Sequence, residues 1–443
     1  MKHQEKKPLA LFHKTPVRQV LFQWPVAPLH NGGHLIGLAL FPLPLSLMIS
    51  AGTHRRFYFF IFACLGLISP YLGWWLNSVL PETELKFALM VFNATLIVIP
   101  TVWGHFAFSS PQPGRWLSHG TIAACIFALG LTQVSSQISL AATCFLILAF
   151  GVFFNPLLPL LEAMTYHQMK NPQTYSKIRL FGSIGFMMCS FLIGGVLLIE
   201  HPRLFPYLVA GLLFVCWISS WPYKQMPPIG ISTVEPVVVS SKKTATPQVL
   251  RSLLSLHPLW VVTCLVQAAF ACYYAFFALH LQHIVSSGWI IGALIALATA
   301  SEIVAFLKID WFFKKWSPIT LIGWACALLL IRWTVLSQAS VALLPLVLVL
   351  QLTQAVGFSV FHTACLKLIH DRVTPLHVGA AQGFYNAIGY GVGGCVGVFV
   401  GGVLWETQKG QGVFVFAAGL CALALVWCVG WRWQQRSAPM DLQ

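Results

Sequence analysis

The sequence predicts an all-α membrane protein with twelve transmembrane helices in two six-helix bundles. Of its 443 residues, 58% are hydrophobic and only 8% are charged, whereas a soluble domain carries roughly 25% charge. The apolar residues gather in runs of about twenty, the length at which a helix spans a bilayer with its backbone groups satisfied. A long polar interruption divides these runs into two equal sets. Membrane lipid is therefore the expected partner of most of the surface.

The ends of the apolar runs are marked by Pro, Gly, Asn or Ser, which favour turns. The predicted spans are 57–76, 85–108, 116–134, 138–166, 178–200, 204–222, 259–284, 289–313, 318–337, 343–368, 379–404 and 411–431.

Residues 1–56 are predicted to be an N-terminal extension outside the bundles. Residues 35–51 are apolar, but they are short for a span and are interrupted by Pro42 and Pro44. We expect an interfacial or unstructured extension without a signal peptide. A start of translation at Met48 is the alternative, because the basic residues Arg55 and Arg56 would then flank the first span.

Lys and Arg are unevenly distributed between the gaps, which predicts the orientation of the chain. One set of gaps holds Arg115, Lys170, Lys177, Lys224, Lys242, Lys243, Arg251, Lys314, Lys315, Lys367 and Arg372. The opposite set holds Lys86, Arg203 and Lys409. We therefore expect both termini on the cytoplasmic side of a bacterial-type inner membrane. The net charge of +15 follows this pattern, so it indicates topology and anionic headgroups and excludes nucleic acid as the expected partner.

Residues 225–256 have the Pro, Ser, Thr and Lys content of a surface linker. They separate an N-terminal bundle at 57–224 from a C-terminal bundle at 257–433, and a cytoplasmic tail follows at 434–443. Carriers with two such bundles bind their substrate between the repeats, at the membrane midplane. The 12 Cys are scattered singly without metal-binding spacing, so neither a disulfide framework nor a metal or cofactor is expected.

Ionisable side chains inside the spans are candidates for function, because placing each there costs roughly 2.5–3.5 kcal/mol on insertion scales. They are Glu162, Arg179, Glu302, Arg332 and His362. Glu162 and Arg179 flank one hairpin, where they form a structural ion pair or separate around a polar substrate. The other three come from consecutive helices and combine an acid, a cation and an imidazole, which suits proton coupling. Glu302 is the preferred proton carrier, and the alternative roles for His362 are substrate binding by a hydrogen bond and packing.

Uncharged polar side chains in the spans indicate either substrate binding or hydrogen bonds between helices. They are Asn155, Gln267, Tyr273, Tyr274, Gln351, Gln354, Gln382, Tyr385 and Asn386. Their clustering favours spans 259–284 and 379–404 as cavity walls, and their aromatic faces suit an aromatic or sugar-like ligand. The four-residue spacing of Gly389, Gly393, Gly397 and Gly401 predicts close helix packing.

Several segments resemble a known family. NPLLPLLEAMTYHQ and TYSKIRLFGSIGF, within 155–186, are similar to the helix four to helix five signature of the lactose-permease and nucleoside-permease-like branch of the major facilitator superfamily. Segments 265–282, 300–306, 331–335 and 361–369 look most like the 3-phenylpropionate permeases of that branch. The resemblance covers residues 57–431 and implies the major facilitator fold and a carrier rather than an enzyme.

By this resemblance, Glu162 and Arg179 match the substrate-binding acid and arginine of lactose permease. Glu302, Arg332 and His362 match members of its proton-coupling set. Lactose permease has a second acid one turn after the helix-ten histidine, where this chain has Cys365. Proton transfer would then rest on Glu302 or another group.

We therefore expect a monomeric carrier that imports a small organic acid, such as an aromatic carboxylate, with a proton by alternating access. A nucleoside or oligosaccharide proton symporter is the alternative. An efflux carrier is disfavoured, because the antiporter-type Gly-Pro motif is absent after Gly182. A membrane-embedded transferase would need clustered acids, and the sequence has no such cluster.

Overall fold

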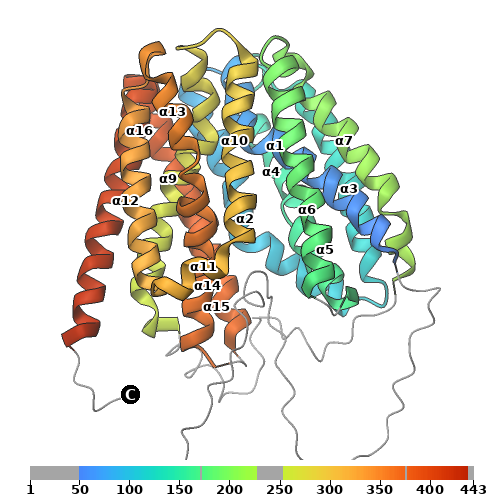
Figure 1. The fold of residues 1–443 in the computed structure, drawn as a ribbon. Coiled ribbons are helices and arrows are strands. Elements are labelled where there is room, and N and C mark those ends of the chain that lie inside the picture. The colour runs from blue at the N-terminus through green and yellow to red at the C-terminus, as the bar shows by residue number, and fades with distance from the viewer. Residues whose placement is uncertain (1–48, 170–171, 227–252, 375–376, 438–443) are drawn as a thin grey trace, which may run out of the picture.

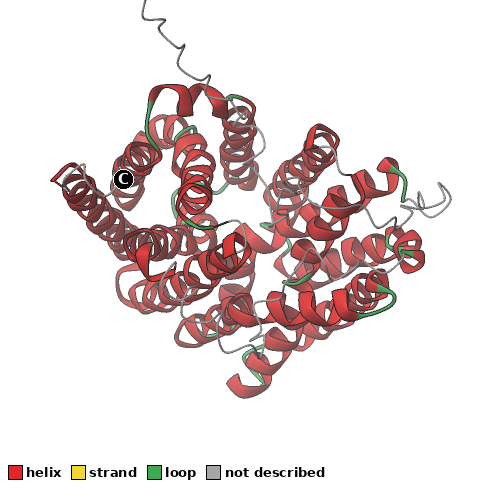
Figure 2. Ribbon diagram, turned by 90° about the horizontal axis from the view of Figure 1, so that it is seen from below, coloured by secondary structure: helices red, strands yellow, loops and turns green. Residues whose placement is uncertain are grey.

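The computed structural model describes residues 49–169, 172–226, 253–374 and 377–437. Every regular element in these ranges is helical, as the view from below in Figure 2 shows. The helices form two bundles that lie side by side in Figure 1, with the blue-to-green first half on the right and the yellow-to-red second half on the left. The predicted fold class is confirmed.

The N-terminal bundle consists of α1 (Ala51–Val79), α2 (Glu82–Ser109), α3 (Pro113–Gly130), α4 (Leu140–Phe154), α5 (Leu157–Met169), α6 (Pro172–Met188), the π-helical η4 (Cys189–Leu198), α7 (Phe205–Ser219) and the short η6 (Trp221–Gln225). The C-terminal bundle consists of α9 (His257–Gln282), α10 (Gly288–Leu307), α11 (Ile309–Lys315), α12 (Pro318–Ser337), α13 (Leu344–Gln351), η9 (Ala355–Val360), α14 (Phe361–Arg372), α15 (Val378–Asn386), η11 (Ala387–Gly393) and α16 (Gly394–Ser437).

The described helices account for all twelve predicted spans. Ten stretches are long and apolar enough to cross a membrane. One of them, Val378–Trp433, contains two predicted spans, because α16 is kinked at Lys409, whose φ of 54° and ψ of −149° are not helical. Counting this stretch as two spans and adding the shorter α3 gives twelve.

The predicted start of the first span was wrong. We placed it at residue 57, whereas α1 begins at Ala51. The Ser50 side chain accepts a hydrogen bond from the Thr53 amide at 3.2 Å and so caps the helix before its first apolar run. Most of the predicted extension, linker and tail lies outside the described residues.

Other predicted spans are interrupted in the structure. Span 138–166 is divided between α4 and α5 at Asn155 and Pro156, because Pro156 has no amide proton to donate to the preceding turn. Span 289–313 is divided at Lys308, where α10 ends and the short α11 begins. Asn155, one of the predicted polar site residues, lies at the break between α4 and α5.

The glycine stripe packs against α9, as predicted. A Cβ on Gly393 would lie 2.6 Å from the Cys264 carbonyl oxygen, and one on Gly397 would overlap the backbone of Ala268. Gly389 and Gly401 meet α9 side chains at similarly short range. Only glycine permits this approach, so η11 and α16 pack directly on the α9 backbone.

Candidate functional site

A cavity of about 870 Å³ lies between the two bundles. Helices α1, α2 and α6 line it on one side, and α9, α10 and α14 line it on the other. Its wall is largely apolar, and many of the lining side chains are aromatic, including Phe62, Phe92, Phe154, Phe186, Phe270, Phe358, Tyr274 and Tyr390. The ionisable side chains among the described lining residues, apart from tyrosines, are Lys177, Arg179, Glu302 and His362. The cavity thus combines an apolar wall with a small number of charges.

On the C-terminal side, Glu302 and Arg332 are connected through a glutamine. Glu302 Oε1 accepts a hydrogen bond from Gln354 Nε2 at 2.8 Å, and Gln354 Oε1 accepts one from Arg332 Nη1. Glu302 and Gln354 line the cavity, whereas Arg332 lies behind its wall. The structure therefore brings the predicted acid and cation together through an amide.

The surroundings of Arg332 hold its guanidinium in place. Its side chain is fully buried, and Nη2 donates a hydrogen bond to Gln351 Oε1 at 2.6 Å. The guanidinium carbon lies 4.5 Å from the ring centroid of Tyr273 and 4.7 Å from that of Trp333, within the range of cation–π attraction. Tyr273 also donates a hydrogen bond to Gln351 Oε1 at 3.2 Å. Amides and aromatic faces thus compensate the buried cation.

The predicted residue His362 lines the cavity next to this network. Its Nδ1 lies 3.0 Å from the Tyr385 hydroxyl, and its ring stacks on Phe358 with an interplanar angle of 7°. Tyr385 is fully buried and is not among the lining residues. Tyr385 therefore orients His362, which itself reaches the cavity.

On the N-terminal side, the predicted acid and arginine contact each other directly. Arg179 Nε donates a hydrogen bond to Glu162 Oε1 at 3.0 Å. The guanidinium also lies 4.1 Å from the ring centroid of Phe62. Arg179 and Lys177 line the cavity, whereas Glu162 is not among the lining residues. A cation thus faces the cavity with its acid partner outside the lining.

Besides Gln354, four of the predicted polar side chains line the cavity: Asn155, Gln267, Tyr273 and Tyr274. Asn155 Nδ2 donates to Thr95 Oγ1 at 2.6 Å and to the Phe92 carbonyl at 3.3 Å, so it bonds to α2. Gln267 Nε2 is buried and has no hydrogen-bond partner among the described residues. This amide is a donor that a bound molecule could use.

Besides Glu162, Arg332 and Tyr385, two further predicted site residues lie outside the cavity lining. Gln382 and Asn386 are absent from its described lining. Gln382 Nε2 lies 3.0 Å from His370 Nε2, so its contact is with a neighbouring helix. Gln382 and Asn386 lie in α15, in the first turns of the predicted span 379–404. The part of this span that faces the cavity begins later, in η11.

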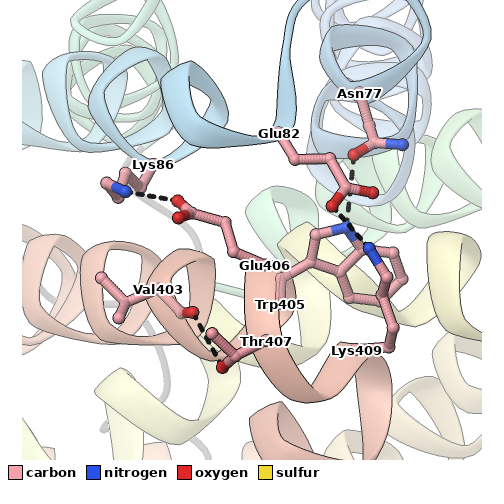
Figure 3. Close-up of polar contacts among 8 residues, drawn as sticks. All are labelled: Asn77, Glu82, Lys86, Val403, Trp405, Glu406, Thr407 and Lys409. Carbon is pink, nitrogen blue, oxygen red and sulfur yellow. Dashed lines mark hydrogen bonds and ion pairs between the residues drawn. The ribbon is translucent and has the colours of Figure 1, made fainter.

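The end of the molecule farthest from Met226 and Leu253, here called the distal end, is closed by polar contacts between the bundles (Figure 3). Lys86 on α2 forms an ion pair with Glu406 on α16. Lys409 Nζ lies 2.5 Å from Glu82 Oε2, and Trp405 Nε1 donates to Asn77 Oδ1 at 3.2 Å. Each contact joins α1 or α2 to α16.

The opposite end, here called the linker end, holds His54, Tyr223 and Met226. His54 Nδ1 lies 2.6 Å from the Tyr223 hydroxyl. The cavity-lining residues Lys177 and Leu307 are both exposed. The cavity therefore reaches the surface toward the linker end while the distal contacts close the other end.

The distal ion pairs and the cavity position of Lys177 were missed from the sequence. Lys86 and Lys409 were recognised as exceptions to the charge bias, and an acid lies within four residues of each. These nearby acids are the feature of the sequence that could have predicted the ion pairs. Lys177 was counted as a topology charge, although it precedes Arg179 by two residues.

Comparisons with known proteins agree with this architecture. Residues 54–416 match the model of the MFS_1 like family. The chain is 26% identical over 369 residues to a probable 3-phenylpropionic acid transporter of Escherichia coli (strain K12), covering 81% of this chain and 91% of that protein. It is 24% identical to the maltose permease of Geobacillus stearothermophilus, covering 81% and 89%.

Solved structures show the same fold at low sequence identity. The nucleoside transporter NupG matches with a TM-score of 0.71 at 16% identity, covering 88% of this chain and 99% of that one. An auto-inhibited POT family peptide transporter matches with a TM-score of 0.67 at 12% identity, covering 90% and 99%. The chain is a multi-pass membrane protein and belongs to the MFS_1 like family of major facilitator secondary transporters, which move small molecules and are not enzymes.

Proposed function

We propose that this transporter imports a small organic anion, such as an aromatic carboxylate, together with a proton. The observation that carries the proposal is the lining of the cavity. Its apolar wall contains many aromatic rings, Arg179 and Lys177 face it from one bundle, and Glu302 faces it from the other. A carboxylate would bind near the two cations while its ring packs on the aromatic wall.

Glu302 is the proposed proton carrier. It is the acid among the described lining residues, and its carboxylate accepts a hydrogen bond from a neutral amide, that of Gln354. A bound anion and an ionised Glu302 in the same low-dielectric cavity repel each other, and protonation removes that repulsion. Anion binding and proton binding therefore favour each other by the same factor. His362 lies in the same wall as a further group that can bind substrate or a proton.

We further propose that the linker end faces the cytoplasm of a bacterial-type inner membrane. The Lys and Arg bias of the gaps supports this orientation. The structure would then be inward-facing, and breaking the distal contacts would accompany the outward-facing state. Because both halves of the cavity belong to one chain, we propose that a monomer carries out transport.

A nucleoside or oligosaccharide proton symporter is the second candidate. The observation that favours it is the unpartnered amide of Gln267, which would suit a hydroxyl or a base carbonyl. The maltose permease of Geobacillus stearothermophilus and the nucleoside transporter NupG are relatives of that kind.

Uptake into sealed proteoliposomes tests the proposal. Labelled 3-phenylpropionate is supplied outside with an inward proton gradient, in competition with unlabelled aromatic acids, nucleosides and maltose. We expect accumulation that stops when a protonophore collapses the gradient, and competition by aromatic acids. Competition by nucleosides or maltose alone would favour the second candidate. Absence of gradient-dependent flux of every compound would contradict both.

A further inference from the structure

A second cavity, of about 740 Å³, lies between α2, α3 and α4. None of its lining residues lines the central cavity. Trp103 and Phe153 form its aromatic side, with ring centroids 5.8 Å apart in an edge-to-face arrangement. Gly120 makes room for this side, because a Cβ there would lie 2.6 Å from the Trp103 ring. The groove is therefore built into the packing of three helices.

The rim of this groove is basic. Arg115 and His119 line it from α3, one helical turn apart, and both are exposed. Gln112 and Ser110 add polar groups beside them. Within the described ranges, the lining contains no acid, and neither Arg115 nor His119 uses its side chain in an ion pair or hydrogen bond. The rim can therefore bind an anion from outside the chain.

The position of the groove indicates what kind of anion that is. Its rim lies where α2 ends at Ser109 and α3 begins at Pro113, between two membrane-spanning helices and therefore near the membrane surface. Phe106, whose ring stacks on that of the lining residue Trp116, is 52% exposed. A ligand here would meet cations at the surface and apolar side chains toward the bilayer.

We propose that this groove binds an anionic phospholipid. Arg115 and His119 bind the phosphate, and Trp103 and Phe153 contact the glycerol and the upper acyl chain. Basic residues at a membrane surface attract anionic headgroups, and tryptophan favours the same interfacial depth. A free phosphate ion would have no use for the aromatic side, so the combination favours a lipid.

Native mass spectrometry of the purified full-length protein tests the proposal without involving transport. The probes are dioleoylphosphatidylglycerol, dioleoylphosphatidylcholine with the same chains, and glycerol phosphate with the same anionic group. We expect phosphatidylglycerol to be retained in preference to both. Replacing Arg115 by Gln should weaken its tightest binding about fivefold, the effect of one cation at a membrane surface. Ala123→Trp, which fills the groove, should remove that binding.

Lys224→Gln is the matched control. Lys224 lies on η6 with its ammonium 4.1 Å from the Trp221 ring centroid, but it does not line the groove. We expect unchanged binding in this variant. Equal retention of phosphatidylcholine, wild-type retention by Arg115→Gln, or retention of glycerol phosphate equal to that of the lipid would each overturn the proposal. Thermal unfolding of each variant in detergent verifies folding, and Arg115 is exposed, so its variant decides the outcome if Ala123→Trp is unstable.

Discussion

The two bundles each bring an acid and an arginine to the central cavity, but they connect them differently. In the N-terminal bundle, Arg179 contacts Glu162 directly at 3.0 Å, and the arginine is the partner that faces the cavity. In the C-terminal bundle, Gln354 lies between Arg332 and Glu302, and the acid is the partner that faces the cavity. The same two residue types thus present opposite charges to the cavity.

The difference follows from how each charge is compensated. Glu162 neutralises Arg179 from behind, so a bound anion would share the cation with an existing acid. Arg332 instead donates hydrogen bonds to two amide oxygens and lies over two aromatic rings, so Glu302 is not its direct ion-pair partner. A carboxyl group without a direct ion-pair partner can exchange its proton, so we propose Glu302 for coupling and Arg179 for recognition.

The largest expected effect is on Glu302. A one-proton symporter can sustain about tenfold accumulation under a tenfold proton gradient. We expect Glu302→Gln to reduce this ratio to about one, because the amide cannot ionise, while exchange of internal for external substrate continues. Uptake and counterflow in proteoliposomes measure the two activities. Glu200→Gln, at an exposed acid outside the cavity lining, is the matched control and should retain accumulation. Uphill uptake by Glu302→Gln would refute the assignment.

Substrate affinity should depend next on Arg179. Removing a charged hydrogen bond costs about 1.5–3 kcal/mol, so Arg179→Gln should weaken binding of an aromatic carboxylate roughly 10–100-fold. Lys177→Gln, which removes an exposed cation from the same wall, should weaken it less than about fivefold. Isothermal titration of the purified protein makes the comparison. Equal losses in the two variants would show that general charge, and not the Glu162–Arg179 arrangement, determines recognition.

The bridging glutamine should matter for stability. Gln354→Leu removes a partner from both Glu302 and Arg332 and should lower the unfolding free energy by about 1–3 kcal/mol. Its control is Gln338→Leu at the exposed end of α12, which should change stability by less than about 0.5 kcal/mol. Thermal and denaturant unfolding in detergent measure both. If Gln354→Leu is as stable as the wild type, the amide does not compensate the buried charges.

The smallest effect is expected at the distal end. Its contacts close the cavity on that side, so both acid–arginine arrangements are accessible only from the linker end. Lys86 and Glu406 are partly exposed, so losing their ion pair should cost about 1 kcal/mol or less and favour distal opening up to about fivefold. Hydrogen exchange should become faster in peptides around 77–86 and 403–409 in Lys86→Gln. The double variant Lys86→Glu/Glu406→Lys should restore protection, and Arg203→Gln should leave it unchanged. Unaltered exchange in Lys86→Gln would mean that this pair does not hold the distal end closed.

The fold could be predicted from the sequence because helices that cross a lipid bilayer need long apolar runs. The Lys and Arg bias of the gaps predicts the orientation of these helices in the membrane. Helix ends were less predictable, since the Ser50 cap and the break at Lys308 depend on individual hydrogen bonds and turns. The buried charges could also be recognised, because placing an ionisable side chain in a membrane span costs free energy. Their partners were not: whether Glu302 meets Arg332 or Gln354 depends on helix rotation, and the distal pairs join residues 320 and 327 positions apart.

The glycine stripe has a mechanical consequence for the transport cycle. Because η11 and α16 rest on the α9 backbone with no side chain between them at Gly393 and Gly397, separating these helices would break a close backbone contact. We therefore expect this side of the cavity to move as one unit during transport. Distance probes on α9 and α16 would keep a constant separation throughout transport. Probes at Lys86 and Glu406 would report the separation of the two bundles at the distal end.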